Sequence, residues 1–352
     1  MKYSIVMPIY NVEKYLKRSA SDIRGQSFQD FELILVDDCS PDASGTMCDQ
    51  LMSEDQRIKV VHLPQNGGLS NARNQGMTVA EGEYILFLDP DDRYDSHLLE
   101  EIEKSLKVNR AQVVIYGLVE EYYDKNENIE YQKQILPEKG YINNALDVRE
   151  QVLDLESCTL FGYAWNKAYD LAYLRELGVQ YQKVTMIEDV LFNIEVFKSL
   201  TSCNLIAKPL YRYAIRKKGS LTTKYLPNYF ELHEQRVDSL CRLYQEWKME
   251  TPEVLKRLGS IYCRYFLSAL QRNAGPASKM SAKKQKRWIK KQFKSQTYMK
   301  LKPFLYPDNF LLKILAWGVR NEKTSFCLLM GQGIYFVKEK CPGLFSRLKQ
   351  NR

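Results

Sequence analysis

Two clusters of acidic residues follow predicted strands early in the chain. The pair Asp37-Asp38 comes directly after the apolar run FELILV, and the run DPDD at residues 89–92 comes after YILFL. The carboxyl ends of parallel strands meet at one edge of an open sheet, where ligands bind. One acidic cluster alone could consist of turn formers or helix caps. Two clusters at the same edge favour a ligand site.

The run DPDD has the chemistry of a site for a hard divalent cation. Mg²⁺ and Mn²⁺ take oxygen ligands, commonly one or two carboxylates together with substrate phosphates. Asp91 and Asp92 are the candidate metal ligands, and the sequence leaves open which of them binds directly. Neither GxGxxG nor GxxxxGK[ST] follows the first predicted strand, so a nucleotide's phosphates need another partner. A bound Mn²⁺ or Mg²⁺ is the expected cofactor.

The elements that must position these acids alternate along the first 116 residues. Apolar runs of five or six residues alternate with stretches of helical spacing, which is typical of βαβ units and a parallel sheet. The predicted strands are 4–9, 31–36, 58–62, 84–88 and 112–116, and the predicted helices are 12–23, 40–52, 70–80 and 96–109. The expected fold class is α/β, with a mostly parallel sheet flanked by helices.

The pattern changes in the second half of the chain. A helix at 187–199 and a late strand at 205–213 are predicted, and after residue 227 only helical spacing remains, at 232–247, 252–272 and 283–293. The sequence therefore predicts two parts, residues 1–222 and 223–352, with the second part helical.

The distribution of charged residues also distinguishes the C-terminal region from the rest of the chain. Residues 279–352 carry 18 Lys and Arg against three acids, a net charge of +15, which leaves −7 of the total +8 to the rest of the chain. A basic region with interleaved apolar residues suits a membrane surface that contains anionic lipid. The alternative is an ordinary helical subdomain with a solvated basic face. Nucleic-acid binding is not predicted, because no nucleic-acid motif accompanies the charge.

Neither an export signal nor a stretch of ~18 apolar residues is present in the sequence. We therefore expect a cytoplasmic protein. If the basic region docks on lipid, the protein would be peripheral on the inner face of the cell membrane.

Four runs, in the order IVMPIYN, FELILVDDCSPD, NGGLSNARN and GEYILFLDPDD, resemble the family 2 glycosyltransferases with the GT-A fold. The runs WNK at 165–167, IEDVLF at 187–192 and RYAIRKKGSLT at 212–222 are also similar, so the resemblance covers residues 1–222. It implies transfer, with inversion, of a hexose or N-acetylhexosamine from a UDP-sugar to a saccharide or lipid-linked saccharide. The implied setting is bacterial surface polysaccharide or glycoconjugate synthesis.

The resemblance also implies roles for single residues. The first strand's end would lie along the nucleotide base, Asp38 would bind the uracil or ribose, and Arg73 would stabilise acid or phosphate charge near the nucleotide. Arg216 and Ser220, which follow the late strand, could contact the diphosphate, or could belong to a solvated basic turn. The donor-binding candidates are Pro8, Ile9, Tyr10, Asp38, Arg73, Asp89, Asp91, Arg216 and Ser220.

An inverting transfer needs a base that accepts the proton of the attacking hydroxyl. Asp189 matches the family's base, although an aspartate at the start of a helix is also a common cap. Glu188 and Trp165 are candidates for the acceptor side, and Trp165 could equally be a core residue. Two rival functions are a catalytically silent module that binds nucleotide sugar or lipid, and a nucleotidyltransferase. The latter is disfavoured because residues 10–17 lack a glycine-rich basic loop.

Overall fold

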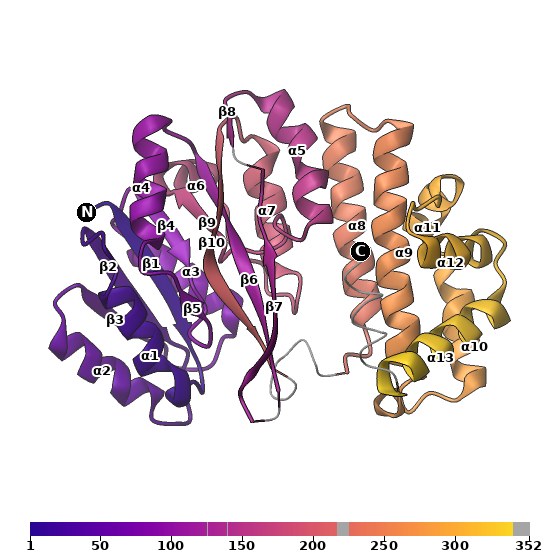
Figure 1. Cartoon of the computed structure of the whole chain (residues 1–352), viewed down its shortest axis with the longest axis horizontal. Coiled ribbons are helices and arrows are strands. Elements are labelled where there is room, and N and C mark those ends of the chain that lie inside the picture. Colours follow the sequence, from indigo (N-terminus) through magenta and orange to yellow (C-terminus); the bar gives the residue numbers. More distant parts are fainter. Residues whose placement is uncertain (125, 139, 217–224, 341–352) are drawn as a thin grey trace. The chain divides into compact units, whose positions relative to one another are not determined.

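The computed structural model describes residues 1–124, 126–138, 140–216 and 225–340. The chain divides into two compact units, Met1–Thr223 and Lys224–Arg352. The boundary predicted between residues 222 and 223, like the candidate Ser220, lies outside the described residues. Each unit is described separately below (Figure 1).

The first unit is built on one large sheet with the strand order β3-β2-β1-β4-β9-β6-β10-β5, with β7 pairing β6 and β8 pairing β10. The strands are β1 (Tyr3–Ile9), β2 (Phe31–Asp37), β3 (Ile58–His62), β4 (Tyr84–Phe87), β5 (Arg93–Tyr94), β6 (Val113–Tyr123), β7 (Ile129–Ile135), β8 (Gly140–Ile142), β9 (Lys167–Asp170) and β10 (Cys203–Ile215). The helices are α1 (Glu13–Arg24), α2 (Ser44–Glu54), α3 (Leu69–Val79), α4 (Leu98–Val108), α5 (Ala145–Ser157), α6 (Leu171–Leu177) and α7 (Glu188–Lys198).

The half of the sheet formed by β3, β2, β1 and β4 is parallel, as the sequence predicts. Every residue of β1, β2 and β4 is buried, which explains why these strands are mainly apolar; the buried Glu32 of β2 accepts the hydroxyl of Ser4 of β1 at 2.6 Å. Helix α3 packs on β1 and β2. The approach is close at Gly76, where an added Cβ would lie 2.3 Å from Cγ1 of Val6.

The other half of the sheet is mixed. Strand β9 lies between β4 and β6 and is antiparallel to both, and β5, β7 and β8 also pair antiparallel. The prediction of an α/β fold with helices around a central sheet is confirmed. The four antiparallel strands were not predicted. Strand β9 has no apolar signal because it begins with Lys167, a buried cation.

The second unit is helical, as predicted. Aromatic rings fill its core, where Phe230 packs on Tyr262, Phe266 and Trp288. No described helix is long and apolar enough to cross a membrane. The helices are α8 (Tyr229–Glu246), α9 (Pro252–Ala274), α10 (Ala282–Gln292), α11 (Gln296–Leu301), α12 (Phe310–Arg320) and α13 (Thr324–Lys340).

Candidate active site

The carboxyl ends of three neighbouring strands bring the predicted donor residues to one edge of the sheet. Ile9 at the end of β1 lies opposite Asp37 on β2, and the Asp38 amide donates to the Ile9 carbonyl at 2.8 Å. On the other side of β1, the amide of Leu88 donates to the carbonyl of Val6 at 3.0 Å. The segments that follow β1, β2 and β4 therefore begin side by side at one edge of the sheet.

The end of β1 carries three of the predicted donor-binding residues, Pro8, Ile9 and Tyr10. Pro8 and Ile9 are buried within the sheet, so their side chains are enclosed by protein. Tyr10 is the first exposed residue after the strand, and Asn11 next to it has a left-handed backbone with φ of 55°. The exposed Tyr10 ring is the part of this segment that a planar base could contact.

Arg73 links two acids that are far apart in the sequence. Its side chain is only 1% exposed. Nη2 donates to Oδ1 of Asp89 at 2.9 Å, and Nη1 donates to Oδ1 of Asp189. The guanidinium of α3 therefore joins the end of β4 to the beginning of α7, and a buried cation of this kind requires such acidic partners.

Asp38 fixes the start of the helix that carries Arg73. Its two carboxylate oxygens accept the main-chain N–H groups of Gly67 and Gly68, each at 2.8 Å. Gly68 has φ of +85°, a backbone conformation for which glycine is the favoured residue, and α3 begins directly after it. Asp38 thus positions Arg73 through the Asn-Gly-Gly turn. Its predicted contact with uracil or ribose stays a prediction.

Asp189 is not a helix cap. The N-cap of α7 is Ile187, and no side chain caps this end of the helix. The second carboxylate oxygen of Asp189 accepts the N–H of Ala164 at 3.1 Å, while the first is paired with Arg73. Two donors from different segments therefore fix the orientation of the carboxylate.

A buried network holds the loop that supplies the Ala164 amide. Nζ of Lys167 donates to the carbonyls of Leu160 at 2.8 Å and Phe161 at 3.2 Å. Nδ2 of Asn193 donates to the Phe161 carbonyl at 2.8 Å and to the Tyr163 carbonyl at 3.1 Å. Burial lowers the pKa of Lys167 to about 7. Sequence reasoning missed both residues, although Asn193 stands one helical turn after the candidate base.

Glu188 is a second acid at the start of α7. Its Oε2 is buried without a hydrogen-bond partner. Burial, reinforced by the charge of Asp189, raises the pKa of Glu188 to about 7. A carboxyl group with an unmet oxygen next to the candidate base is suited to receive a hydroxyl donor, in line with the predicted acceptor role.

The acids of the DPDD run lie in three different environments. Burial raises the pKa of Asp89 to about 6, although the Arg73 charge opposes this. The Asp91 side chain is 49% exposed, and its carboxylate pairs with Nη1 of Arg216 at 3.5 Å. Asp92 is 1% exposed and accepts the Ala214 N–H at 2.8 Å and the Tyr211 hydroxyl at 2.6 Å.

These environments distinguish the two predicted metal ligands. Burial raises the pKa of Asp92 well above its ordinary value, and both of its carboxylate oxygens accept hydrogen bonds within the protein. Of Asp91 and Asp92, only Asp91 has a carboxylate that is exposed to solvent. Among residues 1–216 and 225–340 as described, no three His, Cys, Asp or Glu side chains form a metal cage. A cation bound mainly by substrate phosphates needs only one or two carboxylates, which Asp91 and Asp89 can supply.

Two arginines flank the main chain of the same turn. Nη2 of Arg216 donates to the Asp91 carbonyl at 2.9 Å, and its guanidinium stands 4.6 Å from the Tyr15 ring centroid. Nη2 of Arg18 donates to the same carbonyl at 3.3 Å, and the buried Nε of Arg18 has no partner. Sequence reasoning predicted Arg216 and missed Arg18, whose helical neighbours carry no signal of a site.

Trp165 is a core residue in this structure. Its ring stacks on Tyr163 at 4.3 Å and on Tyr211 at 4.1 Å between centroids, and the residue is only 3% exposed. No face of the indole is open to a sugar, so the structure favours the core alternative over acceptor stacking. The ring packs beside the Tyr211 hydroxyl that binds Asp92.

A sheet of this order with helices on its flanks, and with acids at its carboxyl edge, defines a GT-A-type α/β domain. The crystal structure of Staphylococcus aureus TarS residues 1–349 in complex with UDP-GlcNAc has this fold, with a TM-score of 0.70 at 20% identity over 95% of this chain and 91% of that chain. Residues 4–168 match the family described as Glycosyl transferase family 2. This match spans somewhat less than half of the chain, so the similarity to this glycosyltransferase family is carried by residues 4–168.

Two sequence relatives support this assignment. The uncharacterized glycosyltransferase EpsJ of Bacillus subtilis strain 168 is 27% identical over 81% of this chain and 82% of its own length. The glycosyltransferase GlyG of Streptococcus pneumoniae serotype 4 is 41% identical over 36% of this chain and 40% of its own length. The chain thus matches most of EpsJ and less than half of GlyG.

Proposed function

We propose that the first unit transfers a hexose or N-acetylhexosamine from a UDP-sugar to a hydroxyl of a saccharide, with inversion, in the synthesis of a surface polysaccharide or glycoconjugate. The observation that carries this proposal is the bridge from Arg73 to Asp89 and Asp189, because it assembles a candidate base and the donor-side acids at one edge of the sheet. The UDP-GlcNAc complex of TarS supports a UDP-linked donor.

Asp189 acts as the base in this proposal. Its carboxylate is held in place by the Arg73 guanidinium and by the Ala164 N–H, and remaining lone pairs on its oxygens can accept the proton of an acceptor hydroxyl. Glu188 stands beside it and could hydrogen-bond the same acceptor. Because attack and departure occur on opposite faces of the sugar, a covalent intermediate with the enzyme is not required.

Asp91, rather than Asp92, is the proposed direct ligand of Mn²⁺ or Mg²⁺, with Asp89 as the second acid. When bound, the cation would neutralise the negative charge of the leaving diphosphate. Arg216 and Arg18 stand beside the same turn and would add positive charge there. Tyr10 would contact the base. A saccharide carried on a lipid is the alternative form of the acceptor.

The first test compares Asp189→Asn with the wild type. We expect UDP affinity to survive, because the substitution changes no proposed donor contact, and transfer to fall by about 10²–10⁴-fold because the base is lost. UDP release would be measured across a panel of UDP-sugars, and UDP binding by calorimetry. The matched control is Asp170→Asn, which alters the N-cap of α6 and should keep full activity, since Asn caps as well as Asp. Unchanged turnover in Asp189→Asn would remove the residue as base.

Metal removal tests the second part of the proposal. With EDTA we expect UDP-sugar turnover to stop and to return on addition of Mn²⁺ or Mg²⁺, since only two carboxylates and the phosphates would hold the ion. Turnover that persists in EDTA would contradict the metal role and leave the base untouched. A silent binding module would instead bind UDP-sugar without turning over any donor.

A further inference from the structure

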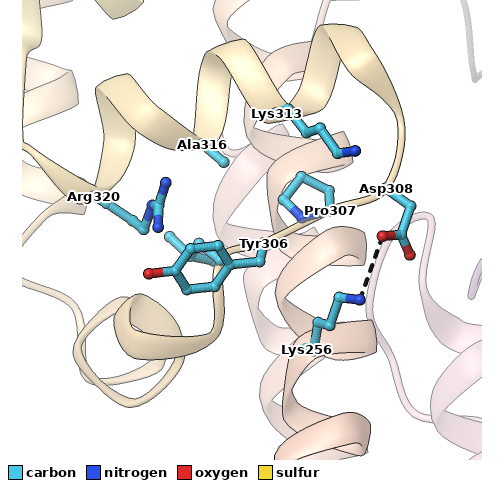
Figure 2. A pocket seen from close by; sticks show the side chains of 8 residues that line it. Lys256, Tyr306, Pro307, Asp308, Lys313, Ala316 and Arg320 are labelled. Carbon is cyan, nitrogen blue, oxygen red and sulfur yellow. Dashed lines mark ion pairs between the residues drawn. The ribbon is translucent and has the colours of Figure 1, made fainter.

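A cavity of about 350 Å³ in the second unit is rich in positive charge. Figure 2 shows Lys256 on α9 facing the segment that precedes α12, with Lys313 and Arg320 on α12 itself. The single acid of the lining, Asp308, pairs with Lys256 at 3.3 Å. Within residues 225–340, no carboxylate pairs with Lys313 or Arg320. The cavity therefore has an excess of two positive charges.

Arg320 has a donor that the protein does not satisfy. Its guanidinium lies 3.8 Å from the centroid of the Tyr306 ring, and its buried Nε has no hydrogen-bond partner. A buried donor without an acceptor is costly, because it has given up its hydrogen bond to water. An anion with several oxygens, such as a phosphate group, would supply both the missing charge and the missing acceptors.

An apolar ridge borders this cavity on α12. Phe310, Lys313 and Trp317 follow one another at spacings of three and four residues and so lie along one side of the helix. Phe310 is 77% exposed and Trp317 is 50% exposed. Lys313 belongs to both the ridge and the cavity lining, so the two features adjoin.

Among the described residues of the second unit, exposed large apolar side chains are confined to one stretch. None occurs among the described residues 225–298, although that stretch includes two long helices. All of them fall between residues 299 and 336: Met299, Tyr306, Phe310, Trp317, Leu329 and Phe336. Exposed apolar side chains next to a cavity that suits an anion are typical of a surface that contacts both the apolar and the phosphate layers of a bilayer.

We propose that this face of the second unit docks on a membrane that contains anionic phospholipid. The cavity holds the phosphate of one lipid headgroup, and the ridge of Phe310 and Trp317 lies in the interface beside it. A soluble phosphate-bearing polymer would meet the charge of the cavity, but it would give no reason for a phenylalanine that is 77% exposed. The proposal uses no residue of the candidate active site and does not depend on the transfer reaction.

Binding of the full chain to vesicles tests this assignment. Phosphatidylcholine vesicles with and without phosphatidylglycerol would be sedimented with the protein, and binding of glycerol 3-phosphate would be measured separately. We expect the double variant Lys256→Gln/Lys313→Gln to bind phosphatidylglycerol vesicles about 25-fold more weakly, at about fivefold per lysine, and to lose glycerol 3-phosphate. The matched control Lys283→Gln/Lys290→Gln removes two exposed charges of α10 and should keep glycerol 3-phosphate binding.

The ridge is tested by Phe310→Ser and, separately, Trp317→Ser. Both side chains are largely exposed, so the unfolding transition should stay that of the wild type. Each variant should bind vesicles more weakly while keeping glycerol 3-phosphate. If the lysine double variant behaves like its control in both assays, the cavity holds no phosphate and the proposal is wrong. If the ridge variants keep full vesicle binding while glycerol 3-phosphate binds, the cavity takes a soluble phosphate and lipid docking is refuted.

Discussion

Replacing Arg73 by methionine tests the central feature of the candidate site. Methionine keeps much of the length and apolar volume of the arginine stem but removes the charge and its donors. The substitution leaves Asp89 and Asp189, whose side chains are 25% and 15% exposed, without their common partner. Arg73→Lys is the companion variant, because a compact ammonium keeps the charge and cannot bridge two acids in the same way.

The size of the effect follows from the burial of the three groups. Removing one partner of a buried ion pair costs about 3–5 kcal/mol, because the remaining charge is left unpaired. The Asp89 pKa, already raised to about 6, should rise further once the Arg73 charge no longer opposes burial. A carboxyl whose pKa is higher in the folded than in the unfolded chain destabilises the fold as pH rises through that pKa.

The deficit of Arg73→Met should therefore be about 3–5 kcal/mol at pH 8 and smaller at pH 5. Each further unit of Asp89 pKa adds about 1.4 kcal/mol to the difference between the two pH values. Transfer should fall as in Asp189→Asn, because the base loses its orientation. Calorimetric unfolding at both pH values, in EDTA, and UDP-sugar turnover are the measurements.

Arg57→Met is the matched control for this experiment. Arg57 also pairs with an aspartate of the first unit, Asp55, but its side chain is 29% exposed and it holds one acid rather than two, so the loss should be smaller than for Arg73→Met, with activity unchanged. If Arg73→Met were no less stable than Arg57→Met at pH 8, Arg73 would not hold the two acids together. A deficit that did not change between pH 5 and pH 8 would contradict the role assigned to Asp89.

Two further predictions concern groups next to Asp189. Burial raises the pKa of Glu188 from 4.5 to about 7, so the stability of the wild type should fall as pH rises from 4.5 to 7. Glu188→Gln should remove this fall and be more stable than the wild type by up to about 3 kcal/mol above pH 7. The measurement is the free energy of unfolding of both proteins over a pH series. A wild-type curve that was flat over this range would contradict the prediction. Lys167→Met removes one of the two donors of the Leu160 and Phe161 carbonyls, which keep Asn166 and Asn193 respectively, and should cost about 1–3 kcal/mol in all. It should also lower kcat far more than UDP affinity, and equal losses in both would mean that Lys167 does not position Asp189.

The parallel half of the sheet and its acids were predictable because each signal is local. The strands β1, β2 and β4 are buried on both faces and so are mainly apolar in sequence, and the acids stand at or just after the ends of β2 and β4. The family resemblance added Asp189. The mixed half of the sheet was not predictable, since β9 begins with a buried lysine whose ammonium donates to carbonyls of the segment just before the strand.

The pairings inside the site were beyond the reach of sequence reasoning for a different reason. Arg73 and Asp189 are 116 residues apart, and nothing in either local pattern indicates that they meet. Asp38 has the pattern of a ligand contact but uses both oxygens to hold a glycine turn. A carboxylate after a strand thus identifies the correct edge of the sheet, whereas its partners depend on loops that fold over that edge.

The DPDD run shows how one motif combines support and chemistry. Asp92 turns inward, where Tyr211 and the Ala214 amide tie it to β10, and so it fixes the turn after β4 to the far half of the sheet. With that anchor in place, Asp91 is held at the surface with an open carboxylate although it lies in a short turn. Asp92 therefore has a structural role, whereas Asp91 can take a chemical one. One residue could not do both, because a carboxylate oxygen that accepts a hydrogen bond between two strands is not free to bind a cation.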